Sequence, residues 1–172
     1  MTILQITTEI LTDAFFAALA GIGFGAISNP PRRAFVFIAL LAAMGHALRF
    51  VLMHHFHYDI ATASLYAGLL IGFTSVPFGY FCHCPTTVLY MPALLPMIPG
   101  KFAYNTLFSI MMFLQNMGEK AHRDMYMDEF FSNGIVTISV VFLLAVGATM
   151  PVFLLPRGVY RMTRHMKKSD IQ

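Results

Sequence analysis

Apolar residues form five long segments along this chain, separated by short polar turns. A membrane-spanning helix needs about 20 predominantly apolar residues, and each segment has about that length or more. The pattern therefore predicts an all-α, polytopic membrane protein, with residues 1–172 forming a single integral membrane domain of five transmembrane helices. The expected spans are residues 10–28, 34–53, 60–81, 86–114 and 134–155.

The fourth segment is the longest and contains Pro92, Pro96 and Pro99. Because proline removes a backbone donor and clashes with the preceding turn, we expect a broken helix. The pattern leaves open whether this segment is one kinked span or a re-entrant hairpin. The polar stretch 115–133 that follows is expected to hold a short amphipathic helix at the membrane interface.

Basic residues fall mainly on one side of the predicted bundle. With five spans, the turn after the first segment and the C-terminal tail share a side, whereas Lys120 and Arg123 lie on the other. By the positive-inside rule the C-terminus is cytoplasmic and the N-terminus external. The residues on the cytoplasmic side are Arg32, Arg33, Arg157, Arg161, Arg164, Lys167 and Lys168.

The composition excludes several classes of protein. The chain is 58% hydrophobic and only 11% charged, whereas soluble domains average roughly 25% charged residues. A soluble enzyme, a disordered tail and a nucleic-acid-binding module are therefore excluded, and the net charge of +3 gives no support to a nucleic-acid partner. No phosphate loop, dinucleotide fingerprint or nucleophile–base signature is present, so we expect neither a cofactor nor an enzymatic activity.

Small residues recur every four positions in the first three segments. Such stripes let helix backbones approach closely in lipid. Ordinary packing within the bundle explains them, and contact with a partner subunit is the alternative. The stripes are Ala17, Gly21 and Gly25, then Ala39, Ala43 and Ala47, then Ser64, Gly68 and Gly72.

Charged and titratable residues inside the predicted spans are the first candidates for function. Asp13 lies about 4.5 Å and Arg49 about 6 Å from the external ends of their helices at 1.5 Å per residue. These matching depths predict an ion pair between Asp13 and Arg49. His46 lies one turn before Arg49, and His46 or Asp13 is a candidate proton carrier. A purely structural pair and a role in a substrate pathway both remain open.

A second candidate lies at the break in the fourth segment. Transporters place substrate sites at broken helices near mid-membrane, and Lys101 would attract a carboxylate there. A kinked helix whose lysine snorkels to the interface is the alternative. The predicted substrate pathway comprises Pro96, Pro99, Gly100, Lys101, Tyr104 and Asn105, together with His46 and Arg49.

Two clusters invite a metal-site interpretation. One is the His54-His55-x-His57 run, and the other is Cys82-His83-Cys84. Neither has the ligand spacing that metal sites usually show. We therefore expect no metal site, and the two cysteines are too close in sequence to suggest a disulfide framework.

Three motifs together resemble those of a known family. They are Asn29-x-Pro31-x-Arg33, Gly45-His46-x-x-Arg49 and Pro96-x-x-Pro99-Gly100-x-x-Ala103-Tyr104. Their order and spacing resemble the threonine/serine exporter family over about residues 10–155. More closely, the chain resembles the small, B-type subunit of the split exporter, the type linked to succinate export.

This resemblance implies a secondary exporter subunit in the plasma membrane of a bacterium, the inner membrane, surrounded by membrane lipids. The implied partner is a larger A-type subunit, forming a hetero-oligomer. The implied substrates are threonine and serine, or dicarboxylates such as succinate. Lys101 lies outside the family pattern, as do the His54–His57 and Cys82–Cys84 clusters. The alternative that the residues leave open is a non-transporting scaffold or assembly subunit.

Overall fold

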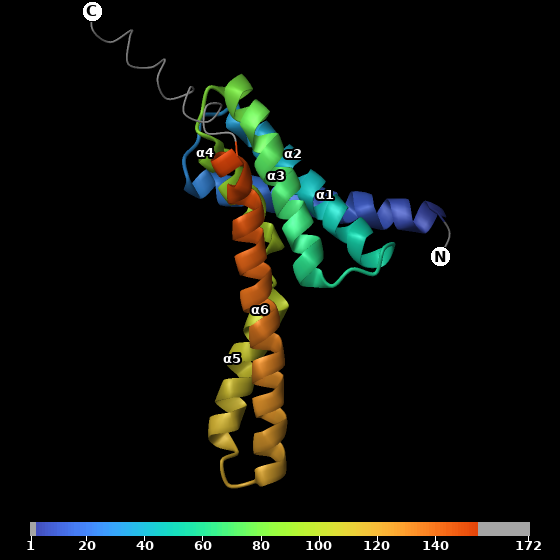
Figure 1. Ribbon diagram of the computed structural model, residues 1–172, viewed down its shortest axis with the longest axis vertical. Helices are drawn as coiled ribbons and strands as arrows, with labels where there is room; N and C mark the ends of the chain where they lie inside the picture. Colours follow the sequence, from blue (N-terminus) through green and yellow to red (C-terminus); the bar gives the residue numbers. More distant parts are fainter. Residues whose placement is uncertain (1–2, 155–172) are drawn as a thin grey trace, which may run out of the picture. The chain divides into compact units, whose positions relative to one another are not determined.

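The structure is a computed structural model that describes the backbone of residues 3–154 and the side chains from residue 5 onward. Within this range every regular element is a helix, which confirms the predicted all-α class (Figure 1). The elements are α1 (Ile3–Ile27), α2 (Ala34–His54), α3 (Ile60–Cys82), α4 (Thr86–Leu94), the 3₁₀ helix η1 (Leu95–Met97), α5 (Gly100–Gln115) and α6 (Lys120–Leu154).

Four of the described helices are long and apolar enough to cross a membrane. They are Gln5–Ile27, Ala34–His54, Ile60–Cys82 and Lys120–Leu154, while Thr86–Met97 forms a shorter apolar helical stretch. The length and apolar composition of these helices indicate a membrane protein. The fifth predicted span, however, is not one continuous helix. It is divided into α4, η1 and α5, so the total of five spans stays a prediction.

Two helices begin earlier than the apolar pattern suggests, because polar residues extend them beyond the apolar segment. α1 begins at Ile3 and not near residue 10. Thr8 and Thr12 donate their hydroxyls to carbonyls of the preceding turn, at 2.8 and 2.7 Å, so they fit a helix. Likewise α6 begins at Lys120, and the predicted separate interfacial helix within 115–133 is the polar first part of α6.

The orientation of the chain stays a prediction. The turn residues Arg32 and Arg33 are exposed, as the positive-inside argument requires of charges outside the membrane. The rest of the basic group, which decides the argument, lies outside the described residues. These residues are Arg157, Arg161, Arg164, Lys167 and Lys168.

The described residues form two compact units, one comprising residues 3–97 and 143–154 and the other residues 98–142. The first unit contains α1 to η1 and the last part of α6. Its core consists of fully buried side chains from four elements. These side chains are Ile38, Leu41, Ile71, Leu89 and Met97.

Glycines set the contact between α1 and α2 in the first unit. A Cβ on Gly21 would lie 2.9 Å from the Ala42 Cβ, and one on Gly25 would lie 3.1 Å from the Ile38 Cδ1. Both glycines are buried. The predicted stripe of α1 is therefore a packing surface within the chain.

The same is true of α3, which packs on the last part of α6. A Cβ on Gly72 would lie 2.7 Å from the carbonyl oxygen of Ala148, and one on Gly147 would lie 2.7 Å from that of Leu65. These neighbours are backbone atoms, which cannot move aside as a side chain can. The two helices therefore approach so closely that only glycine fits at these positions.

The stripe predicted for α2 does not face the core. Ala39, Ala43 and Ala47 are half-buried, because Ile38 and Ala42 meet α1 while Gly45 packs against Ile71 of α3. Because α1 and α3 pack on two sides of α2, the buried positions of α2 differ from the alanines spaced four residues apart. The buried residues of α2 are Ala34, Ile38, Leu41, Ala42, Gly45 and His46.

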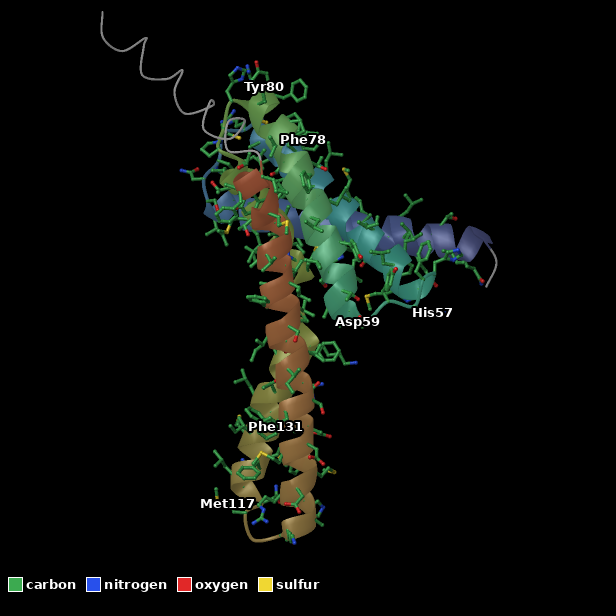
Figure 2. All side chains as sticks on the ribbon, viewed as in Figure 1. His57, Asp59, Phe78, Tyr80, Met117 and Phe131 are labelled. Carbon is green, nitrogen blue, oxygen red and sulfur yellow. The ribbon has the colours of Figure 1, made fainter. Side chains whose placement is uncertain are left out.

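The second unit contains α5 and the first part of α6. The buried Ser109 hydroxyl of α5 donates to Oε2 of Glu129 in α6 over 3.2 Å. The unit also carries exposed apolar side chains, among them Met117 and Phe131 (Figure 2). It is a helical hairpin held partly by a polar contact.

Candidate functional site

The first polar contact of the site joins α1 to α2. Nδ1 of His46 lies 3.1 Å from Oδ2 of Asp13. His46 is buried, with 8% of its surface exposed, while Asp13 is half-buried. A buried imidazole held by a carboxylate at one nitrogen presents its other nitrogen to the opposite side.

The second contact joins α2 to the end of η1. Nη1 of Arg49 donates to the carbonyl oxygen of Met97 over 2.7 Å. The last carbonyls of a helix lack intrahelical partners, and η1 ends at Met97 while α5 begins only at Gly100. Arg49 thus stabilises the backbone where the apolar segment is interrupted.

These contacts change the predicted pairing of charges. No ion pair joins Asp13 to Arg49 in the described part of the chain, since His46 takes the carboxylate and Arg49 reaches the Met97 carbonyl. The Asp13 and Arg49 charges still act on one another electrostatically. Asp13 and Arg49 therefore have other partners than the predicted ones, because the sequence gave no sign of an unpaired carbonyl near Arg49.

The other ring nitrogen of His46 has unused bonding capacity. Its Nε2 is buried and has no hydrogen-bond partner. The backbone of Pro96 nevertheless acts as a hydrogen-bond acceptor toward the ring. His46 and Arg49 therefore both meet the backbone of the interrupted segment.

Two cavities lie between α1 and α2 on the Asp13 side. The first has a volume of about 420 Å³ and is open; it is lined by Thr8, Glu9, Thr12, Asp13, Phe16 and Phe50. The second has a volume of about 260 Å³ and is lined by Ile6, Glu9, Ile10, Phe50, Val51, His54 and His55. Sequence reasoning missed Glu9 as a site residue, although it precedes Asp13 by one helical turn and so shares its face.

The remaining pathway candidates divide between the two units. Pro96 is half-buried in the first unit, whereas Pro99, Gly100, Lys101, Tyr104 and Asn105 belong to the second. Lys101 and Tyr104 are exposed, and Lys101 forms no ion pair within residues 3–154. The role of this group in a substrate pathway stays a prediction.

The histidine and cysteine clusters show ordinary local contacts. The His54 ring stacks on Phe50 at a centroid distance of 4.0 Å, and within residues 3–154 no three histidine, cysteine or acidic side chains are grouped as metal ligands. Cys82 and Cys84 are free thiols and buried. Burial raises the pKa of the Cys84 thiol to about 11.

Residues 13–154 match the family described as "Threonine/Serine exporter, ThrE". The chain belongs to this exporter family. It is also similar to an uncharacterized protein of Haemophilus influenzae, with 30% identity over 137 residues. That alignment covers 80% of this chain and 46% of the relative, so the chain spans about half the length of that relative. No solved structure matches the chain.

Membership of this exporter family agrees with the four long apolar helices of the described residues. Asp13 is the first residue of the matched range, which also contains His46, Arg49 and Met97. Glu9 lies before that range.

Proposed function

We propose that this chain is a membrane subunit of a secondary exporter of small carboxylate-bearing metabolites, working with a larger A-type subunit. Threonine, serine or succinate-like dicarboxylates are the proposed substrates. The observation that carries the proposal is the group of buried His46 and half-buried Asp13 and Arg49 beside the interrupted segment. Membership of the exporter family supports the activity, and the alignment's coverage of only 46% of the relative supports a two-part transporter.

The chemistry of the group suits a carboxylate. The guanidinium of Arg49 has five N–H donors in a planar fork and uses one on the Met97 carbonyl, which leaves donors for a bidentate contact. The unpartnered Nε2 of His46 offers a further donor when it carries a proton. Intramembrane charges of this kind mark ion and substrate pathways.

Lys101, Tyr104 and Asn105 form a second part of the proposed pathway. A lysine at the start of α5 attracts carboxylates whether or not it contacts the bound substrate. Its expected contribution is to the rate of substrate entry, and it is smaller than that of Arg49. The bacterial inner membrane is the proposed location.

Efflux measurements test the proposal. Cells producing this chain with its larger partner are loaded with threonine, serine or succinate, and efflux is followed at equal abundance of the complex. We expect Arg49→Gln to reduce efflux at least tenfold. The matched control is Arg123→Gln, at an arginine whose ion pair is with Asp124 in α6, and it should leave efflux unchanged. Normal efflux with Arg49→Gln contradicts the proposal.

One observation favours a second candidate, a scaffold subunit without a transport role. Ala39 and Ala43 line an open apolar groove of about 320 Å³ between α1 and α2, a shape that accepts a helix of a neighbouring subunit. A scaffold predicts that Arg49→Gln leaves efflux intact while Ala39→Leu dissociates the complex. The efflux assay with co-purification distinguishes the two functions.

A further inference from the structure

We propose that the apolar groove between α1 and α2 binds one anionic phospholipid, with its phosphate at Arg32 and Arg33 and an acyl chain along the groove. This inference goes beyond the proposed transport function. The lipid site is separate from Asp13, His46 and Arg49, and it does not depend on the transported substrate. Both of its parts belong to the first unit.

The groove is lined only by apolar side chains. It has a volume of about 320 Å³, and its walls include Ala18 and Ile22 of α1 and Ala39 and Ala43 of α2. The two α2 alanines are half-buried, and their side chains are too small to fill the space between the helices. Water gains no hydrogen bonds in an apolar cavity, so in a membrane this groove takes an apolar group.

The dimensions of the groove match one acyl chain. At 1.5 Å per residue, Ala43 lies about 15 Å along α2 from Arg33, which is half of the roughly 30 Å hydrocarbon core of a bilayer. Spread over the roughly 12 Å between Phe35 and Ala43, the volume gives a mean cross-section of about 27 Å². A helix is about 10 Å across, so an extended hydrocarbon chain fits the groove better than a helix does.

Arg33 lies on the same face of α2 as the groove. Its backbone is helical, with φ −66° and ψ −27°, so the helical spacing applies to it. Val36 and Leu40 follow it by three and seven residues and therefore share its face, and both line the groove. A guanidinium binds a phosphate through two parallel N–H donors, and Arg32 adds a second positive charge beside it.

Aromatic residues at the end of α3 indicate that Arg33 lies at headgroup depth. Cys82, the last residue of α3, donates its thiol to the Arg33 carbonyl over 3.8 Å, so this end of α3 lies beside Arg33. Tyr80 and Phe81 directly precede it and are exposed, and Figure 2 shows Tyr80 at this end of the helix. Tyrosine is enriched at membrane–water interfaces, where the lipid phosphates lie.

The charges of Arg32 and Arg33 have no acidic counterpart at this end of the first unit. Both side chains are exposed, and neither forms an ion pair within residues 3–154. The acidic residues in the described part of this unit are Glu9, Asp13 and Asp59. The first two lie at least about 21 Å before the end of α1, and Asp59 follows the far end of α2. Two unneutralised guanidinium groups attract an anion.

An anionic headgroup fits this end better than a zwitterionic one. The choline group of phosphatidylcholine brings a positive charge near the two arginines, whereas phosphatidylglycerol carries a net negative charge. Each basic residue near the membrane surface adds about fivefold to the affinity for an anionic lipid. Inorganic phosphate has no acyl chain and gains nothing from the groove.

Lipid binding to the purified full chain tests the site. Native mass spectrometry in detergent micelles compares phosphatidylglycerol with phosphatidylcholine of the same acyl chains. We expect the native chain to prefer phosphatidylglycerol about thirtyfold, and Arg32→Gln with Arg33→Gln to abolish this preference. The matched control, Lys120→Gln with Arg123→Gln, removes the same charge from α6, where Arg123 pairs with Asp124, and should retain it.

A second pair of variants tests the groove. Ala43→Leu fills its inner end and should weaken the binding of both lipids about tenfold, because fewer methylene groups of the acyl chain are buried. Ala47→Leu is the control, since it makes the same change one turn further along α2, at a half-buried position that does not line the groove. Thermal unfolding in lipid-free micelles verifies that each variant is folded.

Several outcomes would overturn the proposal. Equal binding of the two lipids, or an unchanged preference without the two arginines, would mean that lipid surrounds the helices unspecifically. Unchanged binding by Ala43→Leu, or displacement of phosphatidylglycerol by inorganic phosphate, would mean that the groove does not hold the acyl chain. Loss of the lipid when the larger partner binds would mean that a helix of the partner occupies the groove. None of these measurements depends on transport, so they stand apart from the efflux test.

Discussion

The α1–α2 pair is closed at one end and open at the other. At the closed end, Gly21 and Gly25 let the helices touch, and Cys82 of α3 donates its thiol to the Arg33 carbonyl at 3.8 Å. At the open end, Glu9 and Asp13 line a cavity of about 420 Å³. Small residues thus let the helices touch at one end, while polar residues line an open cavity at the other.

The two ends of α3 show the same difference, with one end packed against α2 and the other exposed. Phe78 near one end contacts Phe37 of α2 at a ring-centroid distance of 4.9 Å. At the other end, the turn containing His57 and Asp59 is exposed (Figure 2). The closed end therefore has apolar and aromatic contacts between helices, and the open end has polar groups in reach of solvent.

The largest expected effect is a difference in thiol reactivity between the two ends. Cys84, at the closed end, is buried and burial raises its pKa to about 11, so its thiolate fraction near neutral pH is about a hundredfold below that of an ordinary cysteine. A cysteine placed at the open end by Thr12→Cys should react with a water-soluble maleimide about a hundredfold faster, as peptide mass spectrometry would show.

The pH dependence provides the check on this prediction. Only the thiolate reacts, so labelling of Cys84 should keep rising tenfold per pH unit until the pH approaches about 11. Labelling of Thr12→Cys should level off about two units earlier. Equal rates at the two positions would show that the closed end is not closed.

The next effect concerns the glycines that hold the closed end together. Gly21→Leu should lower the free energy of unfolding by about 1–3 kcal/mol, because the added side chain meets Ala42 and forces the helices apart. Gly23→Leu is the matched control, since a Cβ there meets nothing within 4 Å. Unfolding in mixed detergent micelles measures both, and similar losses would mean that helix propensity and not packing is responsible.

A smaller effect is expected at the polar contact of the open end. Asp13→Ala removes the hydrogen bond to His46, which should lower the free energy of unfolding by about 1 kcal/mol. Glu9→Ala, one turn away and exposed, should change it much less. If Asp13→Ala were as harmful as Gly21→Leu, the open end would contribute as much to folding as the closed end.

The smallest effect concerns the start of α3. Asp59 accepts hydrogen bonds from the Thr62 side chain and from the backbone N–H groups of Thr62 and Ala61, and the Thr62 side chain is the main cause of its lowered pKa. Because the folded pKa lies below the unfolded one, this stabilisation is present above the unfolded value and is lost as pH falls through the folded value. Asp59→Ala should cost about 0.5–1 kcal/mol at neutral pH.

The pH profile separates this capping effect from simple loss of a side chain. The difference in unfolding free energy between the native chain and Asp59→Ala should shrink as the pH is lowered below about 4. Thermal unfolding followed by circular dichroism at several pH values measures it. A constant difference would mean that the charge of Asp59 is not involved.

Much of the fold could be read from the sequence because lipid imposes strict rules on it. Apolar length predicts helices, and the small-residue stripes of α1 and α3 proved to be packing surfaces. The apolar pattern failed at α1 and α6, where polar residues such as Thr8 and Asn133 continue a helix by bonding to their own backbone. Hydropathy indicates which residues lie in the membrane. A helix, in contrast, ends only where its backbone hydrogen bonds end.

The sequence singles out the residues of the candidate site but not the contacts that they make. Asp13, His46 and Arg49 stand out because charges are costly within membrane spans. Their partners could not be deduced, because helical periodicity gives the face of a residue and not its neighbour across the interface. Arg49 donates to the Met97 carbonyl, which lacks an intrahelical partner because the helix is interrupted after Met97.

The sequence by itself determined that this chain is an all-helical membrane protein and which residues of its spans carry charge, because the cost of burying polar groups in lipid acts locally. Only the tertiary structure decided that Asp13 meets His46, that Arg49 holds the Met97 carbonyl, and that Glu9 lines a cavity at the open end. Those contacts depend on how α1 and η1 pack against α2, which side chains far apart in the sequence set together.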